Sequence, residues 1–245
     1  LESRFGAIED DGRTRVGIGV ATGADAVYIV DEGTDIEPDR LVPLIMRDDI
    51  DRGNIKDAHR NVINTFDDAG RLVNLDNYPR LRNYLLSHHA VVGNRHVAKV
   101  NKAGWFRTID RVNPELVKKP KLLIPDIAGS NEVVYDPGRY HPHHNLYFVT
   151  STVWDLEVLG GLLSSRVALF FVWSYAVKMR GGYLRFQAQY LRRIRVPNPS
   201  TLSTKLAGDL RKAFRKRDFN ACDNLAMRAY GLLTLPSFDF VDTRT

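Results

Sequence analysis

The chain has 245 residues and 44% hydrophobic content, enough to bury a sizeable core and to exclude a disordered protein. Thirty-five Lys and Arg against 29 Asp and Glu give a net charge of +6. Basic residues gather at 99–121, 178–195 and 205–217, and most acidic residues lie elsewhere. This asymmetry predicts one face that attracts a polyanion.

One cysteine, Cys222, excludes an internal disulfide and a set of thiolates for zinc. A reducing, cytoplasmic compartment is the expected location. The chain starts at Leu1 without an initiator Met or a signal-like segment, so we interpret it as a fragment of a longer protein. The apolar run 158–177 is interrupted by Arg166 and Gly160-Gly161, which favours a buried helix over a membrane span.

In chain order, two short strands are expected at 16–21 and 26–30, joined by a turn into a hairpin. The glycines Gly17, Gly19 and Gly23 have the spacing GxGxxxG and precede a strand, which disfavours a phosphate-binding loop. A short apolar run at 41–50, a strand near 61–66 and a helix that begins at Pro79 follow.

The second half predicts strands at 105–112, 121–127, 132–136 and 145–151. A long apolar helix at 155–178 is expected to be the centre of the core. Residues 183–194 alternate like a strand with Phe186 and Tyr190 packed inward, and helices at 201–217 and 220–230 complete the chain. The expected fold class is α+β, with a mixed curved β-sheet packed on the long helix and a helical C-terminal extension.

Motifs of common enzyme classes are missing. The sequence has no D-x-K or E-x-K triplet of PD-(D/E)xK nucleases, no G-x-S-x-G elbow and no Walker lysine motif. Asn113-Pro114-Glu115-Leu116 lacks the second proline and the aromatic residue of the NPPY signature of amino-methylating enzymes. No catalytic residue is therefore predicted.

Three histidines, His141, His143 and His144, lie close enough in sequence to raise the hypothesis of a metal site. The HPHH run lacks the helical i, i+4 spacing and the distant third ligand of zinc sites. We therefore expect solvated loop histidines that contact phosphate, and no metal.

The stretch 178–197 is the strongest candidate for binding an anion. It holds six Lys or Arg, no carboxylate, a Gly181-Gly182 pair and the aromatic residues Tyr183, Phe186 and Tyr190. Nucleic acid is the partner that this combination favours. The aromatic residues Phe186 and Tyr190 are interpreted as core, and Arg180 and Arg185 as functional.

Several of these segments together resemble the C-terminal target-recognition (specificity) region of N6-adenine DNA methyltransferases of the TaqI and Eco57I type. The resemblance covers roughly residues 14–200 and rests on KPKLLIPDI at 119–127, N-x-Y at 145–147, LGGLLSS at 159–165 and GGYLRFQAQYL at 181–191.

The resemblance implies a noncatalytic domain, residues 1–200, that recognises double-stranded DNA, with residues 201–245 as the helical extension. It also implies an upstream domain of the same chain that binds S-adenosylmethionine and carries the NPPY motif, and it implies no cofactor in this fragment. Loop position and charge give the candidate DNA-binding residues Lys118, Lys119, Lys121, Arg139, Tyr140, His141, His143, His144, Asn145, Lys178, Arg180, Gly181, Gly182, Tyr183, Arg185 and Gln187.

Two alternatives stay open at this stage. One is a self-contained metal-dependent nuclease that uses the His141 to Asn145 cluster with Asp126 or Asp136. The other is a protein-interaction scaffold whose basic face is incidental.

Overall fold

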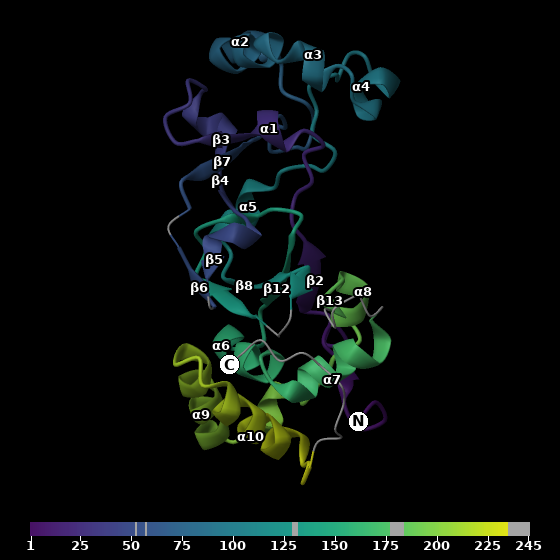
Figure 1. Ribbon diagram of the computed structural model, residues 1–245, viewed down its shortest axis with the longest axis vertical. Helices are drawn as coiled ribbons and strands as arrows, with labels where there is room; N and C mark the ends of the chain where they lie inside the picture. Colours follow the sequence, from purple (N-terminus) through teal and green to yellow (C-terminus); the bar gives the residue numbers. More distant parts are fainter. Residues whose placement is uncertain (52, 57, 129–131, 177–183, 235–245) are drawn as a thin grey trace.

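The computed structural model describes residues 1–51, 53–56, 58–128, 132–176 and 184–234. The molecule is elongated, with helices α2, α3 and α4 at one end and α9 and α10 at the other (Figure 1). Two four-stranded sheets lie between these helical ends. The predicted α+β class is confirmed, although the strands form two main sheets and not one.

The sheet nearer α9 and α10 has the order β10-β8-β12-β2, and all its neighbours are antiparallel. Its central strand β8 is buried along its whole length. Because side chains alternate across a strand, Leu122 and Ile124 join the main core, whereas Leu123 packs with Ile45 on the opposite face. The strands are β2 (Thr14–Ile18), β8 (Lys121–Pro125), β10 (Val134–Asp136) and β12 (Leu146–Ser151).

The second sheet has the order β11-β4-β7-β3, and β11 runs parallel to β4. A separate core that includes Tyr28, Ile63 and Leu85 joins this sheet to the helices at its end of the molecule. The strands are β3 (Ile29–Asp31), β4 (Leu41–Ile45), β7 (Arg60–Ile63) and β11 (His141–Pro142), and the helices are α1 (Asp25–Tyr28), α2 (Pro79–Ser87), α3 (His89–Val92) and α4 (His96–Val100).

The predicted hairpin at 16–30 is wrong, because β2 and β3 belong to different sheets and α1 lies between them. The chain crosses from one sheet to the other at Gly19, where a Cβ atom would lie 2.2 Å from the carbonyl oxygen of His143. This close contact between two backbones, and not a hairpin turn, is what requires glycine there.

The predicted strand at 105–112 is also absent from the structure. Phe106 packs in the core beside Tyr28, and the Arg95 guanidinium donates to the carbonyl oxygens of Trp105 (3.1 Å) and Arg107 (2.7 Å). The Arg95 side chain therefore donates the hydrogen bonds that these carbonyl oxygens would otherwise receive from a neighbouring strand.

The single helix expected at 155–178 is two helices, α6 (Leu156–Leu163) and α7 (Arg166–Tyr175), bent by 62°. The break is stabilised because the Ser165 side chain accepts a hydrogen bond from Ala168 N and caps α7. No single helix among the described residues is long and apolar enough to cross a membrane; the bent α6–α7 pair passes that test by length and composition, and it is mostly buried.

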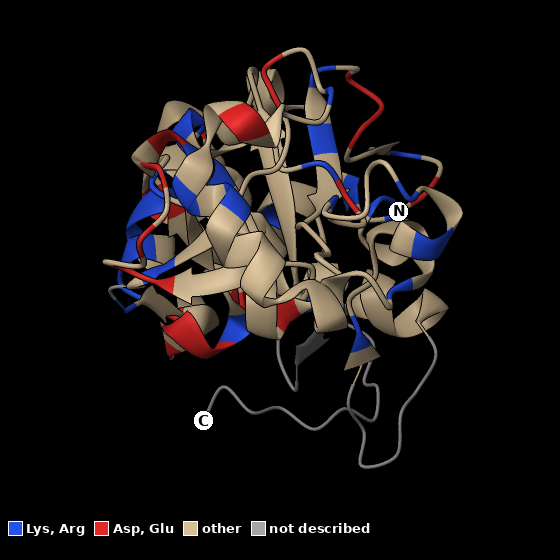
Figure 2. Cartoon of the chain, turned by 90° about the horizontal axis from the view of Figure 1, so that it is seen from above, with Lys and Arg blue, Asp and Glu red and all other residues tan. Residues whose placement is uncertain are grey.

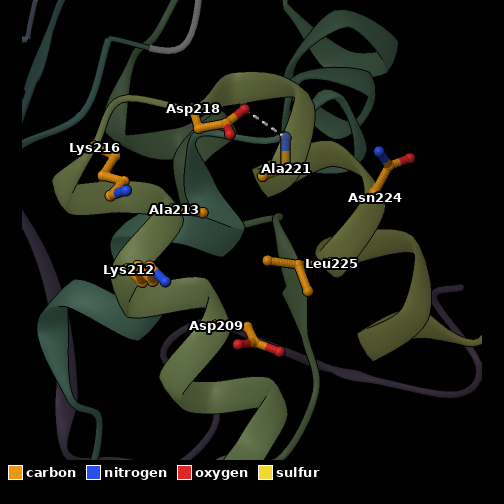
Figure 3. A pocket seen from close by; sticks show the side chains of 8 residues that line it. All are labelled: Asp209, Lys212, Ala213, Lys216, Asp218, Ala221, Asn224 and Leu225. Atoms are coloured by element: carbon orange, nitrogen blue, oxygen red, sulfur yellow. Dashed lines mark hydrogen bonds between the residues drawn. The ribbon is translucent and has the colours of Figure 1, made fainter.

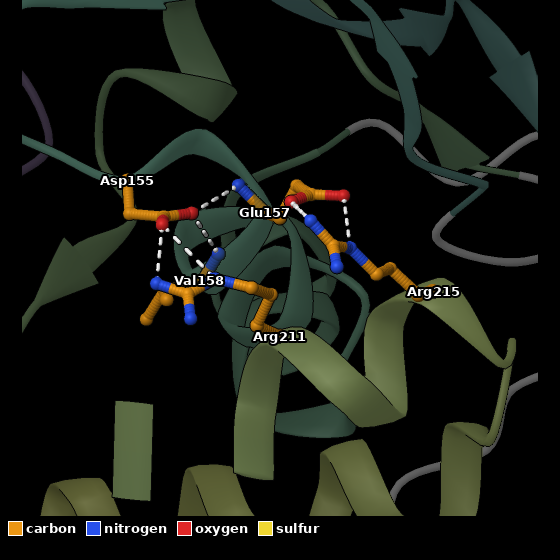
Figure 4. Close-up of polar contacts among 5 residues, drawn as sticks. All are labelled: Asp155, Glu157, Val158, Arg211 and Arg215. Carbon is orange, nitrogen blue, oxygen red and sulfur yellow. Dashed lines mark hydrogen bonds and ion pairs between the residues drawn. The ribbon is translucent and has the colours of Figure 1, made fainter. Parts of the chain in front are cut away.

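The C-terminal helices α9 (Thr204–Arg215) and α10 (Phe219–Tyr230) pack on α6 and complete the main core with Leu210, Phe214 and Leu225. Two ion pairs on the surface join α6 to α9, from Arg211 to Asp155 (2.6 Å) and from Arg215 to Glu157 (2.5 Å) (Figure 4). The domain boundary between 200 and 201 stays a prediction.

Short elements connect these layers. Residues 184–194, expected to continue one strand, hold a two-residue strand and a short helix, with Phe186 buried and Tyr190 half-buried. The remaining elements are α5 (Pro114–Lys118), α8 (Ala188–Leu191), the strand pairs β1 (Gly6–Ala7) with β14 (Arg195–Val196), β5 (Ile50–Asp51) with β6 (Asn54–Ile55) and β9 (Ile127–Ala128) with β13 (Leu184–Arg185), and 3-10 turns at Pro38–Arg40, Arg47–Asp49, Leu75–Asn77 and Pro199–Thr201.

Candidate nucleic-acid interface

Six of the predicted site residues within the described ranges lie beside the two ends of strand β8. Lys118, Lys119 and Arg139 lie beside its start, and we call them the basic end. Asn145, Arg185 and Gln187 lie beside its finish, and we call them the amide end. A strand of this length spans about 13 Å, so the two ends are distinct sites on one sheet.

At the basic end, the turn after β10 packs against the end of α5. Gly138 has a positive φ of 110°, and a Cβ atom there would lie 2.7 Å from the carbonyl oxygen of Lys118. This contact brings Lys118, Lys119 and Arg139 to one exposed surface. Lys118 pairs with Glu115 at 3.0 Å, whereas no carboxylate of the described residues lies within ion-pair distance of Lys119 or Arg139.

Lys121 lies beneath this surface in the protein interior. Its Nζ is 2.8 Å from Asp136 Oδ2, both side chains are fully buried, and Nζ also donates to the carbonyl oxygens of Val117 and Lys119. Burial lowers the pKa of the Lys121 ammonium, and the hydrogen bond to Asp136 opposes that change. The ammonium predicted to contact DNA is therefore engaged inside the fold, where it positions the basic end.

Tyr140, His141 and His143 are buried as well, unlike the solvated loop that we expected, because β11 forms part of a sheet. Burial lowers the pKa of His141 to about 4, so its imidazole is neutral at physiological pH. His143 Nε2 lies 3.1 Å from Asp25 Oδ2. Only His144 of the three histidines is exposed.

The amide end joins three segments of the chain. Asp126 N donates to Asn145 O (3.0 Å), Phe186 N donates to Asp126 O (2.7 Å), and Arg185 pairs with the Asp126 carboxylate at 2.8 Å. The hydrogen bond from Arg185 to the Asp126 carboxylate raises the pKa of the guanidinium. The Arg185 side chain is 41% exposed. The predicted residues Lys178, Arg180, Gly181, Gly182 and Tyr183 precede this point and lie outside the described residues.

Gln187 and Arg47 make the remaining contacts at the amide end. Gln187 is half-buried at the start of α8, where its amide oxygen accepts from Gln189. Arg47 was not predicted: its backbone N donates to Asn145 Oδ1 (3.2 Å), and its guanidinium pairs with Glu132 (2.9 Å). No local pattern marks Arg47, because only the parallel pairing of β4 with β11 brings it to Asn145.

Charge alone does not define the interface. Lys and Arg segments intermix with Asp and Glu segments around the periphery of the fold (Figure 2). The pocket of about 410 Å³ between α9 and α10 is lined by Lys212 and Lys216 together with Asp209 and Asp218, so its charges balance (Figure 3). Positive charge alone therefore does not single out one surface among the described residues.

The nuclease alternative finds no support in this geometry. Asp126 is paired with Arg185, and Asp136 is buried against Lys121 and accepts three backbone N–H groups from residues 138–140. Within the described ranges, neither carboxylate is available beside His141 to activate water.

Comparison with known proteins identifies the architecture. The model of the TaqI-like C-terminal specificity domain matches residues 61–196, more than half of the chain. The chain belongs to the TaqI-like C-terminal specificity domain family. The matched residues include β8, β12, α6 and α7, and therefore both the basic end and the amide end.

Curated relatives extend the similarity beyond the specificity domain. The chain is 50% identical over 233 residues to the Type II methyltransferase M.PaeR7I of Pseudomonas aeruginosa, covering 95% of this chain and 40% of that protein. It is 52% identical over 205 residues to the Type II methyltransferase M.BstVI of Geobacillus stearothermophilus, covering 83% of this chain and 36% of that protein. The chain thus spans about two fifths of the length of these relatives.

Solved structures share the fold at low sequence identity. The Type IIL restriction-modification enzyme MmeI, solved in complex with DNA, matches with a TM-score of 0.65 and 10% identity over 91% of this chain and 33% of that one. The type IIG restriction endonuclease BpuSI matches with a TM-score of 0.55 and 13% identity over 94% of this chain and 32% of that one. The TaqI-like specificity domain here therefore has the fold found in restriction-modification enzymes.

Proposed function

We propose that this chain is the noncatalytic, sequence-specific DNA-recognition part of a restriction-modification methyltransferase. The observation that carries the proposal is the specificity-domain match over residues 61–196, which spans both ends of β8. Recognition of a duplex requires contacts to phosphates and contacts to base edges. The exposed cations of the basic end suit the first, and the amide and guanidinium groups of the amide end suit the second.

The basic end contacts phosphates. Lys119 and Arg139 are exposed and have no carboxylate partner among the described residues, and Lys118 pairs only with an exposed Glu115. Surface ion pairs of this kind contribute about 1 kcal/mol or less, so a phosphate displaces Glu115 at small cost. Phosphate contacts of this type fix the register on DNA and carry no sequence information.

The amide end contacts base edges. Arginine pairs with guanine O6 and N7, and Asn and Gln pair with adenine N6 and N7 in the major groove. Arg185 is oriented by Asp126, and Asn145 is oriented by the backbone of Arg47, so both groups are held in place before DNA arrives. Preorganised groups of this kind lose little side-chain entropy on binding.

The rest of the protein is also a proposal. The relatives are Type II methyltransferases that are about two and a half times longer than the aligned segment, which supports an upstream domain of the same chain that binds S-adenosylmethionine. The resemblance to the TaqI and Eco57I type supports adenine N6 as the methylated atom, a target that must leave the base stack. The partners are then duplex DNA and that upstream domain, in the cytoplasm.

A selection from a random duplex library tests the proposal. The 245-residue chain is incubated with the library at physiological salt, and bound duplexes are sequenced over several rounds. We expect one short consensus, and we expect Arg185→Ala to relax it at one or two positions, because each bidentate base contact contributes about 1–3 kcal/mol of discrimination. Enrichment of no sequence by the wild-type chain would contradict the proposal, and a protein-interaction scaffold would then be the better account.

A further inference from the structure

Asp25, His143 and His144 form a cluster that the sequence does not reveal, because Asp25 and His143 are 118 positions apart. Two backbone contacts bring the segments together. His144 N donates to Val20 O at 3.0 Å, and Val20 pairs with His143 in an isolated parallel bridge. The chain then turns at Thr22 into α1, whose first residue is Asp25.

The geometry of the cluster fits a metal ion. His143 Nε2 is 3.1 Å from Asp25 Oδ2, and one ligand atom from each of the three residues lies within 4.8 Å of the others. Two ligands of one tetrahedral Zn²⁺, each about 2.0–2.2 Å from the ion, lie about 3.3 Å apart. The Asp25–His143 pair already has that spacing, and the exposed His144 places its ligand atom within 4.8 Å of both.

The surroundings fix two of the three side chains. His143 is buried, and its backbone N donates to Ile45 O at 2.9 Å. Asp25 Oδ1 accepts a hydrogen bond from Thr22 Oγ1, which orients the carboxylate and leaves Oδ2 toward His143. A hydrogen bond to a ligating carboxylate, such as the one from Thr22 to Asp25, is typical of metal sites.

The charge balance also favours a cation. Over the part of the chain that the structure describes, no Lys or Arg pairs with Asp25, whose side chain is 42% exposed. His144 lies on the solvent side of His143, with ring centroids 4.0 Å apart. An ion bound there is reachable from solvent and keeps an open position for water.

A simple hydrogen bond between His143 and Asp25 explains their contact but assigns no role to His144. We propose that Asp25, His143 and His144 bind one divalent transition metal ion, with Zn²⁺ the best match for two imidazoles and a carboxylate. The ion joins the start of α1 to the turn between β11 and β12, which also holds Asn145. This site needs no DNA and goes beyond the proposed function.

Isothermal titration of the 245-residue chain with ZnCl₂, after removal of bound metal by a chelator, tests the proposal. We expect one equivalent of Zn²⁺ to bind and the melting temperature to rise, because a ligand that binds only the folded state stabilises it. His144→Ala removes an exposed ligand without disturbing the core, so we expect the metal-free variant to melt like the metal-free wild type. Its Zn²⁺ affinity should fall at least tenfold.

His89→Ala is the matched control, because His88 and His89 form another adjacent pair with His89 exposed. The control should bind Zn²⁺ like the wild type, and Asp25→Asn should lose affinity as His144→Ala does. Equal Zn²⁺ affinity of wild type and His144→Ala, loss of binding in His89→Ala, or no binding by the wild type would each overturn the proposal.

Discussion

Lys121 and Asp136 form a fully buried ion pair across strands β8 and β10, with Nζ and Oδ2 2.8 Å apart. Among the described residues, the other hydrogen bonds of the pair go to backbone: Nζ donates to Val117 O and Lys119 O, and the carboxylate accepts N–H groups of residues 138–140. The pair therefore holds both turns that carry Lys118, Lys119 and Arg139, and it links the core of the sheet to the basic end.

Replacing Lys121 should destabilise the protein strongly. Lys121→Met keeps the aliphatic chain but leaves the Asp136 carboxylate buried without its cation, which costs about 3 kcal/mol or more. Urea unfolding followed by circular dichroism measures the change. Lys119→Met is the control: it removes an exposed lysine two positions away, and its free energy of unfolding should stay within about 0.5 kcal/mol of wild type.

Gly19→Ala should be destabilising, because its Cβ would lie 2.2 Å from His143 O and 2.4 Å from Pro142 O, both backbone atoms. The segments that connect the two sheets must then separate, and we expect a loss of about 2 kcal/mol or more in unfolding free energy. Gly208→Ala is the opposite case: no atom lies within 4 Å of its Cβ, and it lies inside α9. That substitution should stabilise the protein by about 0.5–1 kcal/mol.

The ion pair between Asp155 and Arg211 should give a small, pH-dependent contribution to stability (Figure 4). Partial burial alone would raise the pKa of the Asp155 carboxyl, but hydrogen bonds from Arg211 and from Val158 N outweigh it and lower the pKa below 3.8. Asp155→Asn keeps a good helix cap and removes only the charge. Since the side chains are about 40% exposed, we expect a loss of about 0.5 kcal/mol at neutral pH.

The sign of the pH dependence follows from the lowered pKa. A carboxyl that binds its proton less readily in the folded state stabilises that state above the unfolded pKa, and the stabilisation disappears as pH falls through the folded value. Wild type and Asp155→Asn should thus differ in urea unfolding at about pH 7, and the difference should shrink as pH falls below 3.8. A difference that stays constant over this range would show that the charge of Asp155 is not the cause.

The basic end should set the salt dependence of DNA binding. A triple variant with Lys118→Ala, Lys119→Ala and Arg139→Ala loses up to three phosphate contacts, and the slope of log affinity against log salt should fall by about 0.9 for each. Fluorescence anisotropy with a labelled duplex measures that slope.

A charge-matched control separates this effect from net charge. Lys205→Ala, Lys212→Ala and Lys216→Ala remove three exposed lysines of the α9 region and leave Lys118, Lys119 and Arg139 in place. This control should leave the slope close to that of wild type. An equal change in both variants would mean that the basic end is not the phosphate-binding surface.

The sequence predicts the elements whose patterns are local. The run KLLIP is a buried strand and Pro79 starts a helix as expected. The helix expected from residue 201 begins later, at Thr204, where the Ser203 side chain caps it. The sequence does not predict which strands pair. Strands β2 and β3 are close in the chain yet lie in different sheets, since each pairs with a strand that is 29 or more residues away.

The candidate interface shows the same contrast between local patterns, which the sequence reveals, and long-range pairing, which it does not. Exposure of Lys119, Arg139 and His144 agrees with their positions in polar loops, and Lys118 is exposed at the end of α5. The burial of Lys121 could not be predicted, because only the pairing of β8 with β10 brings Asp136 to it. His141 and His143 are buried for a similar reason: Pro142 between them lies in a two-residue strand that no local pattern marks.

The most direct test of sequence-specific DNA recognition compares two duplexes of equal length and composition, one with the selected consensus and one with it scrambled. The Kd of the 245-residue chain is measured for both at physiological salt by fluorescence anisotropy. We expect the consensus duplex to bind at least about 1,000-fold more tightly, the lower bound for specific protein–DNA complexes. Equal Kd values for the two duplexes would contradict the account.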